Sequence, residues 1–197
     1  MMLTRIAVAV AGALAVGSFA AVAAPVPKHL MPKDEPLLFP TKVGARHVSV
    51  FGGKDLVEEV SKVTPVDGGF EVETETVSDD GTRKHQQTVV VSKHGILWTH
   101  YEGQKLDPAC WAVKLPHAEG NSWQANWGGQ ERTLSTAGWE EIEVPAGKFR
   151  AIRVTHDERG KGNADSSMWY APGIGCVTWY CTNSKVGRPL KSFTPGK

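Results

Sequence analysis

The stretch from Phe70 to Tyr101 reads FEVETETVSDDGTRKHQQTVVVSKHGILWTHY, and it decides the fold class. It contains three runs rich in residues that favour strands, at 70–77, 86–92 and 96–101. Within these runs several residues alternate between polar and apolar. Such runs are typical of strands. The segments between them contain Gly81 and Gly95, and glycine can adopt the positive φ of a tight turn. The stretch therefore predicts antiparallel strands joined by short turns.

The same pattern extends over most of the chain. Further strands are expected at 47–51, 57–63, 123–127, 132–144, 149–156, 166–171 and 176–181. The turns between them leave no room for the long crossover that parallel strands need. About ten strands exceed what a flat sheet tolerates. We therefore expect an all-β single domain, a strongly curved antiparallel meander that forms an open barrel or half-barrel. One run, 56–63, fits a helical spacing almost as well.

The first 23 residues have the anatomy of a removable secretory signal. Arg5 gives a cationic start, residues 6–16 are apolar, and the segment ends in Ala21-Val22-Ala23. This order of charge, apolar core and small-residue exit is that of a signal peptide. The apolar core is shorter than the ~20 residues of a spanning helix. We expect export to the periplasm or medium after cleavage near Ala23, with no transmembrane segment in the mature chain.

Residues 24–40 differ in composition from the rest of the mature chain. They contain five prolines, which favour extended and poorly paired backbone. We interpret 24–40 as a proline-rich arm whose end, Leu37-Leu38-Phe39, docks on a β domain spanning 41–197. Removal of Arg5 with the signal leaves 21 basic and 21 acidic residues. This balance supplies no field that would attract nucleic acid, and no nucleic-acid partner is expected.

Three cysteines, Cys110, Cys176 and Cys181, would accompany the chain into a compartment where disulfides persist. If residues 175–182 form one strand, Cys176 and Cys181 lie roughly 16 Å apart. A disulfide tolerates Cα separations of about 7 Å at most. Any bridge would then join Cys110 to Cys176 or to Cys181. The alternative is that all three are unbridged and mostly buried.

Two turn segments stand out, VPAGKF at 144–149 and WYAPGIG at 169–175. In the first, proline presets one turn dihedral, glycine absorbs a positive φ, and phenylalanine re-enters the sheet. In the second, proline cannot donate to the ladder and the glycines permit a tight reversal. We interpret both as turns that specify the fold, through Pro145, Gly147, Phe149, Trp169, Pro172, Gly173 and Gly175.

With these turns and the stretches Phe39-Pro40 to Gly44 and Lys114 to Trp123, the chain resembles the TapB-like family of exported bacterial β-proteins. The resemblance runs from about Phe39 to Cys181. It implies a curved antiparallel half-barrel similar to that of bacterial lipoprotein carriers, and it brings no catalytic residues. His47 and Cys176 depart from the family pattern, which predicts an altered ligand pocket.

The chain has seven tryptophans, most of which we expect to fill a curved interior. Trp123 and Trp127 are four residues apart on one strand, among amide side chains and glycines. That arrangement suits sugar recognition, or it closes one end of the core. The ligand-binding candidates are Trp98, Trp123, Trp127 and Trp169.

No motif in the sequence nominates a catalytic centre, a metal site or a cofactor. There is no G-x-S-x-G, H-E-x-x-H or phosphate-loop pattern, and the seven histidines are scattered. We therefore expect a non-enzymatic exported domain that binds or scaffolds at the cell envelope, with an apolar or lipid-like guest on the concave sheet face. The alternatives are glycan or cell-surface adhesion through exposed tryptophans, and an envelope hydrolase with a dispersed site. The partner is then a lipid, a glycan or another envelope component.

Overall fold

The computed structural model describes residues 37–118, 120–127, 130–157 and 165–197, and this part of the chain holds twelve strands and no helix. The first six strands are β1 (Arg46–Phe51), β2 (Lys54–Val66), β3 (Gly69–Val77), β4 (Arg83–Ser92), β5 (Gly95–Tyr101) and β6 (Gln104–Lys114). The other six are β7 (Ser122–Trp127), β8 (Gln130–Val144), β9 (Gly147–Asp157), β10 (Ser166–Ala171), β11 (Gly175–Cys181) and β12 (Val186–Thr194). The predicted all-β class is confirmed. The helical alternative for 56–63 is wrong, because these residues lie in β2.

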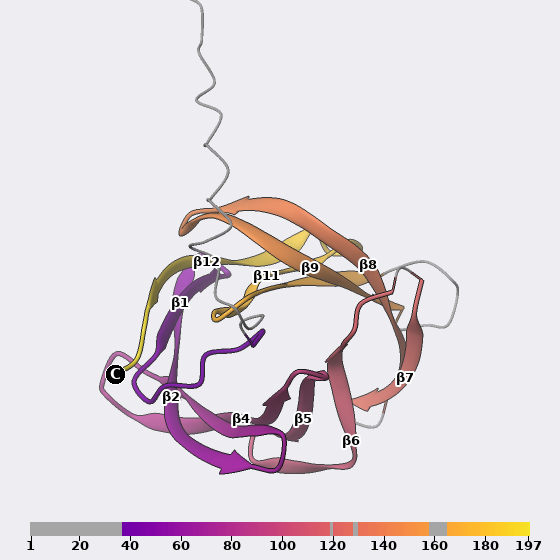
Figure 1. Ribbon diagram of the computed structural model, residues 1–197. Coiled ribbons are helices and arrows are strands. Elements are labelled where there is room, and N and C mark those ends of the chain that lie inside the picture. Colours follow the sequence, from indigo (N-terminus) through magenta and orange to yellow (C-terminus); the bar gives the residue numbers. More distant parts are fainter. Residues whose placement is uncertain (1–36, 119, 128–129, 158–164) are drawn as a thin grey trace, which may run out of the picture. The chain divides into compact units, whose positions relative to one another are not determined.

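All twelve strands belong to one antiparallel sheet, built from two meanders. Its order is β6-β5-β4-β3-β2-β1-β12-β11-β10-β9-β8-β7, so each half of the chain runs from strand to adjacent strand. The pairing of β1 with β12 joins the halves, with His47 opposite Phe193. The sheet curves round until its two end strands, β6 and β7, lie beside each other (Figure 1). The predicted curved meander is therefore confirmed as a nearly closed barrel with one seam.

Two of the twelve strands are absent from the sequence prediction, and both contain proline. In β6, Pro108 falls between the residues paired with β5, where the register shifts. Proline is tolerated there because β6 is an edge strand. In β12, Pro189 lies one residue beyond Leu190, the last partner of β1. Both strands therefore contain a proline, a residue whose presence makes a strand hard to predict from the local sequence.

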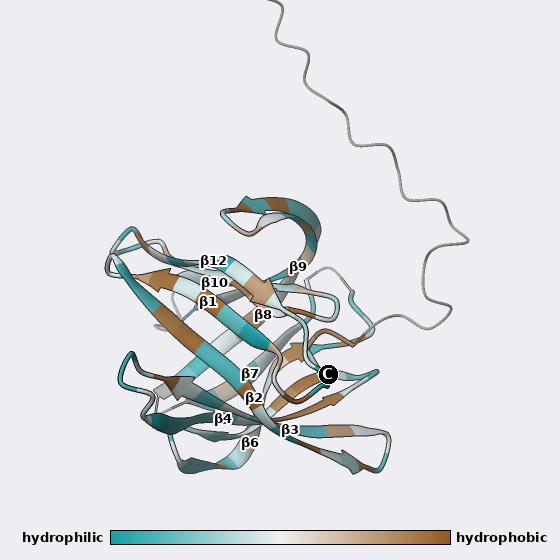
Figure 2. Cartoon of the chain, turned by 90° about the vertical axis from the view of Figure 1, so that its left-hand side faces the viewer, coloured by the Kyte–Doolittle hydropathy of each residue, from teal (hydrophilic) through white to brown (hydrophobic). Residues whose placement is uncertain are grey.

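Side chains from alternate strand positions form the core. Figure 2 shows hydrophobic and hydrophilic positions alternating along several strands. Fully buried aliphatic residues come from β2 to β6 and from β8 and β9: Val60, Val72, Val89, Val91, Ile96, Val113, Leu134, Ile152 and Val154. Leu38 and Phe39 join this core and are 3% and 7% exposed. The predicted docking of the 37–39 segment is confirmed. The signal peptide, the arm up to residue 36 and the cleavage site lie outside the described residues and stay predictions.

A second, smaller apolar cluster involves the end of the β8–β9 hairpin. Its buried members are Val144, Ala151, Ala171, Val177 and Leu190. Strand β9 buries both of its faces here, because Ala151 belongs to this cluster and the next residue, Ile152, belongs to the main core. The hairpin turn is tied to β12 by a hydrogen bond from the amide of Ala146 to the carbonyl of Leu190, 3.0 Å long.

The seam between β6 and β7 is held by side chains, since no ladder pairs these strands in the described residues. The indole Nε1 of Trp123 on β7 donates a hydrogen bond of 2.8 Å to the carbonyl oxygen of Trp111 on β6. The ammonium group of Lys114 lies 5.6 Å from the centroid of the Trp123 ring. The Trp123 side chain is therefore a structural link between the ends of the sheet.

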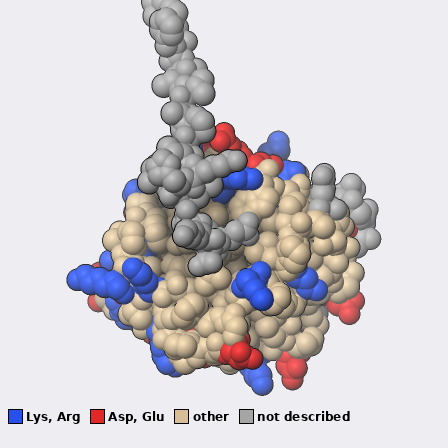
Figure 3. Space-filling model, viewed as in Figure 1, with Lys and Arg blue, Asp and Glu red and all other residues tan. Residues whose placement is uncertain are grey.

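On the face that Figure 3 shows, basic and acidic side chains lie scattered among other residues. Within the ranges given above, no helix is long and apolar enough to cross a membrane.

Candidate functional site

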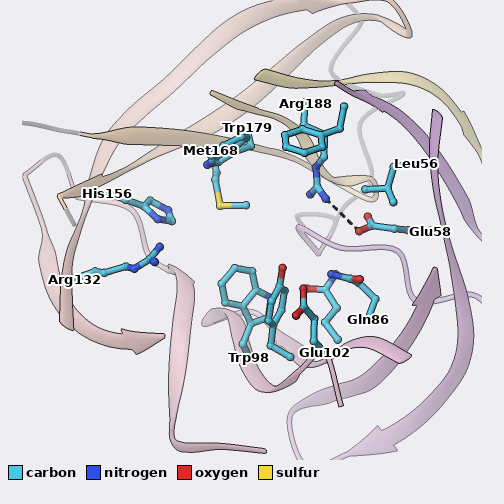
Figure 4. Close-up of a pocket in the computed structure, with 13 residues that line it drawn as sticks. Leu56, Glu58, Gln86, Trp98, Glu102, Arg132, His156, Met168, Trp179 and Arg188 are labelled. Atoms are coloured by element: carbon cyan, nitrogen blue, oxygen red, sulfur yellow. Dashed lines mark hydrogen bonds and ion pairs between the residues drawn. The ribbon is translucent and has the colours of Figure 1, made fainter. Parts of the chain in front are cut away.

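A cavity of about 600 Å³ lies within the barrel. Figure 4 shows its lining, which comes from strands of both meanders. The lining residues are Phe51, Leu56, Glu58, Gln86, Gln87, Trp98, Tyr101, Glu102, Arg132, His156, Met168, Trp179 and Arg188. Pockets of about 300–1,000 Å³ with mostly apolar walls and a few polar groups are typical of small-molecule sites. The cavity is therefore the candidate functional site.

The strands position these side chains by their twofold alternation. Leu56 and Glu58 precede Val60 on the same face of β2, and His156 follows Val154 on β9. Each of these strands thus carries aliphatic residues in the core and polar residues where it reaches the cavity. A register shift in the β3–β4 pairing falls at Gln86, so both it and its neighbour Gln87 line the wall.

One wall of the cavity carries an ion pair. Arg188 Nη1 on β12 lies 3.3 Å from Glu58 Oε1 on β2, with side-chain exposures of 24% and 14%. Burial is the largest influence on Arg188 and disfavours its charged form, but Glu58 together with Cys176, Tyr101 and Tyr170 outweighs it, so the pKa of Arg188 is raised above its ordinary value. This pair is compensated within the protein, and it leaves a polar but electrically balanced surface facing the cavity.

Another wall carries Arg132 of β8 and His156 of β9, which lie near each other in Figure 4. His156 is 2% exposed, and its Nε2 is a buried atom with no hydrogen-bond partner. Burial, and secondarily the positive charge of Arg132, lowers the pKa of His156 to about 4. The imidazole is therefore neutral at pH 7, with a ring nitrogen that makes no hydrogen bond within the protein.

Apolar side chains occupy the space between these polar groups. Trp98, Met168 and Trp179 all line the cavity, and Trp98 and Met168 are 5% and 7% exposed. The ring of Trp179 also lies 6.3 Å, centroid to centroid, from that of Phe51, whose side chain is 48% exposed. An apolar molecule could contact indole, thioether and phenyl surface together.

A narrow cavity of about 40 Å³ adjoins the main one and shares Glu58, Gln87, Trp98, Met168 and Arg188 with it. His47 and Cys176, the two residues that depart from the family pattern, both line it. The His47 ring stacks at a tilt 5.0 Å from Phe193, and its Nε2 is hydrogen-bonded to the carbonyl of Ile174. Burial lowers the pKa of His47. These two residues thus shape the end of the cavity.

The structure separates the four tryptophans that the sequence nominates. Of the three whose side chains the structure describes, only Trp98 lines the main cavity. Trp123 is 7% exposed and holds the seam, so it cannot present an open face to a sugar, and the expectation of an exposed Trp123 is corrected. Trp169 packs on the second cluster and donates a hydrogen bond to Glu140. The side chain of Trp127 lies outside what the structure describes.

The two turn motifs both contribute residues to the second cluster and make structural contacts there. Gly147 has a φ of 130°, and Phe149 packs on that cluster. Gly173 has a φ of 72° and donates from its amide to the carbonyl of Leu37. A Cβ on Gly175 would lie 3.1 Å from the Phe39 ring, so the close approach of these two residues requires glycine. Neither segment lines the main cavity.

All three cysteines are free thiols, so the disulfide from Cys110 to Cys176 or Cys181 is not formed in this structure. Cys110 is buried in the core, and Cys176 and Cys181 are partly buried. Burial raises the pKa of Cys110 and of Cys176 to about 11. These thiols therefore pack as small apolar groups and are poor nucleophiles at neutral pH.

The described residues contain no cluster of three or more side chains suited to holding a metal ion. A buried serine, Ser166, stands opposite His156 in the β9–β10 pairing. Neither Ser166 Oγ nor His156 Nε2 has a hydrogen-bond partner, so the two are not bonded to each other. The hydroxyl is therefore not activated by this imidazole in the structure.

Sequence reasoning missed most of the cavity lining. Glu58, Arg132, His156, Met168, Trp179 and Arg188 were not nominated by any motif, and they come from six strands. One signal was present: Glu58 and His156 are polar residues in phase with buried valines on the same strand face. A polar residue at an inward position indicates either a cavity or an unusual core.

Two solved structures share the fold at low sequence identity. One is a candidate lipoprotein of Parabacteroides distasonis, with a TM-score of 0.51 and 16% identity over 82% of this chain and 100% of that chain. The other is a candidate exported protein with a YmcC-like fold from Bacteroides fragilis, with a TM-score of 0.52 and 15% identity over 81% of this chain and 99% of that chain. No family model and no curated protein matches the chain, so the TapB-like resemblance is not confirmed.

Proposed function

We propose that this chain is an exported, non-enzymatic β-protein of the cell envelope that holds an apolar or lipid-like guest inside its barrel. The observation that carries the proposal is the cavity of about 600 Å³ lined by Trp98, Met168 and Trp179 with a few polar groups. Burial of apolar surface against such walls contributes roughly 25 cal/mol per Å², which favours a guest with a sizeable apolar part.

The location at the envelope rests on two separate supports. The first is the signal-like sequence of residues 1–23. The second is the fold, which this chain shares with proteins that are themselves described as a candidate lipoprotein and a candidate exported protein. In favour of a non-catalytic role, the buried Ser166 hydroxyl and the His156 imidazole make no hydrogen bond with each other.

Native mass spectrometry of protein purified gently from its host, without detergent, tests the proposal. We expect a population with added mass that is released by organic solvent, and we expect the emptied protein to bind an environment-sensitive apolar dye. Leu56→Trp, which places an indole at the cavity wall, should abolish both signals. Val66→Trp, at the other end of β2 on a side chain that is 38% exposed, is the matched control and should retain them.

A protein of clean apo mass that binds no dye would reject the proposal. Equal loss in Leu56→Trp and Val66→Trp, with both variants folded, would show that the guest sits elsewhere. Turnover of a generic ester, peptide or glycoside by the purified protein would contradict the non-enzymatic part.

A further inference from the structure

The cavity contains a polar position that the protein leaves without a partner. His156 is 2% exposed, lines the cavity, and its buried Nε2 makes no hydrogen bond. A buried polar atom without a partner is unfavourable, because it has lost its hydrogen bonds to water and gained none in the protein. Such atoms are rare in native proteins, and an unseen ligand is one reason for them. The position of Nε2 therefore points to a hydrogen-bonding group on the guest.

The charge next to this nitrogen indicates the sign of that group. Arg132 lines the same wall, and its positive charge reaches the His156 ring, whose pKa it lowers. On the other side of the cavity, Arg188 already lies beside Glu58 at 3.3 Å. A neutral imidazole can donate from Nε2, and a guanidinium carries only donors. Together they favour a group that accepts hydrogen bonds and carries negative charge.

The rest of the lining indicates where the remainder of such a guest lies. Figure 4 places Met168, Trp98 and Trp179 between the Arg132–His156 wall and the Glu58–Arg188 pair. These side chains supply apolar contacts and no further cationic group. Leu56 and Phe51, which also line the cavity, add to the apolar surface.

We propose that the guest is an amphiphile whose anionic oxygen head, a carboxylate or a phosphate, accepts hydrogen bonds from His156 and Arg132, while its apolar chain lies against Trp98, Met168 and Trp179. This inference rests on the proposed function and adds the chemical class of the head. A charge-assisted hydrogen bond is about twice as strong as a neutral one, so the head gives the guest a defined orientation in the cavity.

Binding of three probes with the same chain length tests this inference: dodecanoate, dodecyl phosphate and methyl dodecanoate. Each is titrated into delipidated protein and measured by calorimetry or dye displacement. We expect at least one of the two anions to bind about tenfold or more tightly than the ester, since 1.4 kcal/mol corresponds to tenfold. The two anions distinguish a carboxylate head from a phosphate head.

Variants then locate the head. Arg132→Gln and His156→Gln should each reduce the preference for the anion over the ester to about threefold or less, with ester affinity changed by less than about twofold. Lys185→Gln is the matched control, because it removes a positive charge from an exposed position in the β11–β12 turn. It should keep the full preference. A bound anion should also raise the pKa of His156 measured by NMR, against a background of Glu58, Glu102, Arg132 and Arg188 facing the cavity.

The outcomes separate the two levels of the claim. Equal affinity of the wild-type protein for ester and anions overturns the head-group inference and leaves the guest-binding function standing. Binding of none of the three probes, together with a clean apo mass, overturns both. If the buried variants fail to fold, the wild-type comparison and the NMR titration still decide.

Discussion

Replacement of Trp123 by phenylalanine should open the barrel at its seam. The indole Nε1 donates a 2.8 Å hydrogen bond from β7 to the Trp111 carbonyl on β6, and no ladder joins these strands in the described residues. The change deletes that bond and leaves the carbonyl without this donor. The net value of a hydrogen bond is about 0.5–1.5 kcal/mol, and an unsatisfied buried partner costs about 1–3 kcal/mol. Lost indole contact adds to this, so we expect a loss of about 2–3 kcal/mol in the free energy of unfolding.

Urea denaturation measures this loss, and hydrogen exchange locates it. Amides of β6 and β7 should exchange faster in Trp123→Phe, while those of β2 and β3 keep their wild-type rates. Trp139→Phe is the control, because Trp139 is a partly buried indole packed on the core that, in the described residues, donates no hydrogen bond to β6. Its loss should stay within about 1 kcal/mol, mostly from weaker contact with Arg150, which stacks over the Trp139 ring. A loss below about 0.5 kcal/mol in Trp123→Phe, or faster exchange spread evenly over the sheet, would refute the role of Trp123 at the seam.

Three further perturbations follow from the cavity and the core. Glu58→Gln leaves the largely buried Arg188 without its counter-charge, and urea denaturation should show a loss of about 1–3 kcal/mol in the free energy of unfolding. Asp55→Asn breaks the exposed pair of Asp55 with Lys191 and should change that free energy by less than about 0.5 kcal/mol. Equal effects of the two variants would contradict this expectation. The pKa of His156 is about 4 in the folded protein and 6.5 for an ordinary histidine, so between these pH values the unfolded state binds a proton that the folded state does not. The contribution of neutral His156 to the free energy of unfolding should therefore be complete above pH 6.5 and fall, by on the order of 3 kcal/mol, as the pH drops towards 4. Buried His47 contributes with the same sign. A His156→Gln variant whose stability has the same pH dependence as the wild type would refute this. Without reductant, iodoacetamide should label Cys110 and Cys176 slowly in the folded protein at pH 8 and all three cysteines in urea, and labelling of a single thiol in urea would reveal a disulfide.

Local patterns in the sequence were sufficient for ten of the twelve strands and for the antiparallel curvature. The Phe70–Tyr101 stretch corresponds to β3, β4 and β5 because its polar and apolar alternation agrees with its turn residues. Strands β6 and β12 were not predicted, because Pro108 and Pro189 weaken the local strand pattern. Their places are fixed by long-range pairing, β6 as an edge and β12 as the partner of β1. Local propensity carries no information about such partners.

The cavity could be predicted only in part for the same reason. Trp98 is large, aromatic and on a recognisable strand, and it does line the cavity. Glu58 and Arg188 are separated by 130 positions in the chain and become neighbours only when β12 closes against β1. The amides and glycines around Trp123 in the sequence are typical of an exposed binding residue, yet closure of the sheet buries its side chain against β6. Knowledge that β12 pairs with β1 and that β6 lies beside β7 would have assigned both correctly.

A crystal structure of the protein purified from its own envelope fraction, without detergent, tests the central claim most directly. We expect elongated density between Trp98 and Trp179, with its polar end within hydrogen-bond distance of His156 Nε2. A cavity that holds only ordered water, or one that has closed by collapse of Met168 and Trp179 onto Trp98, would contradict it.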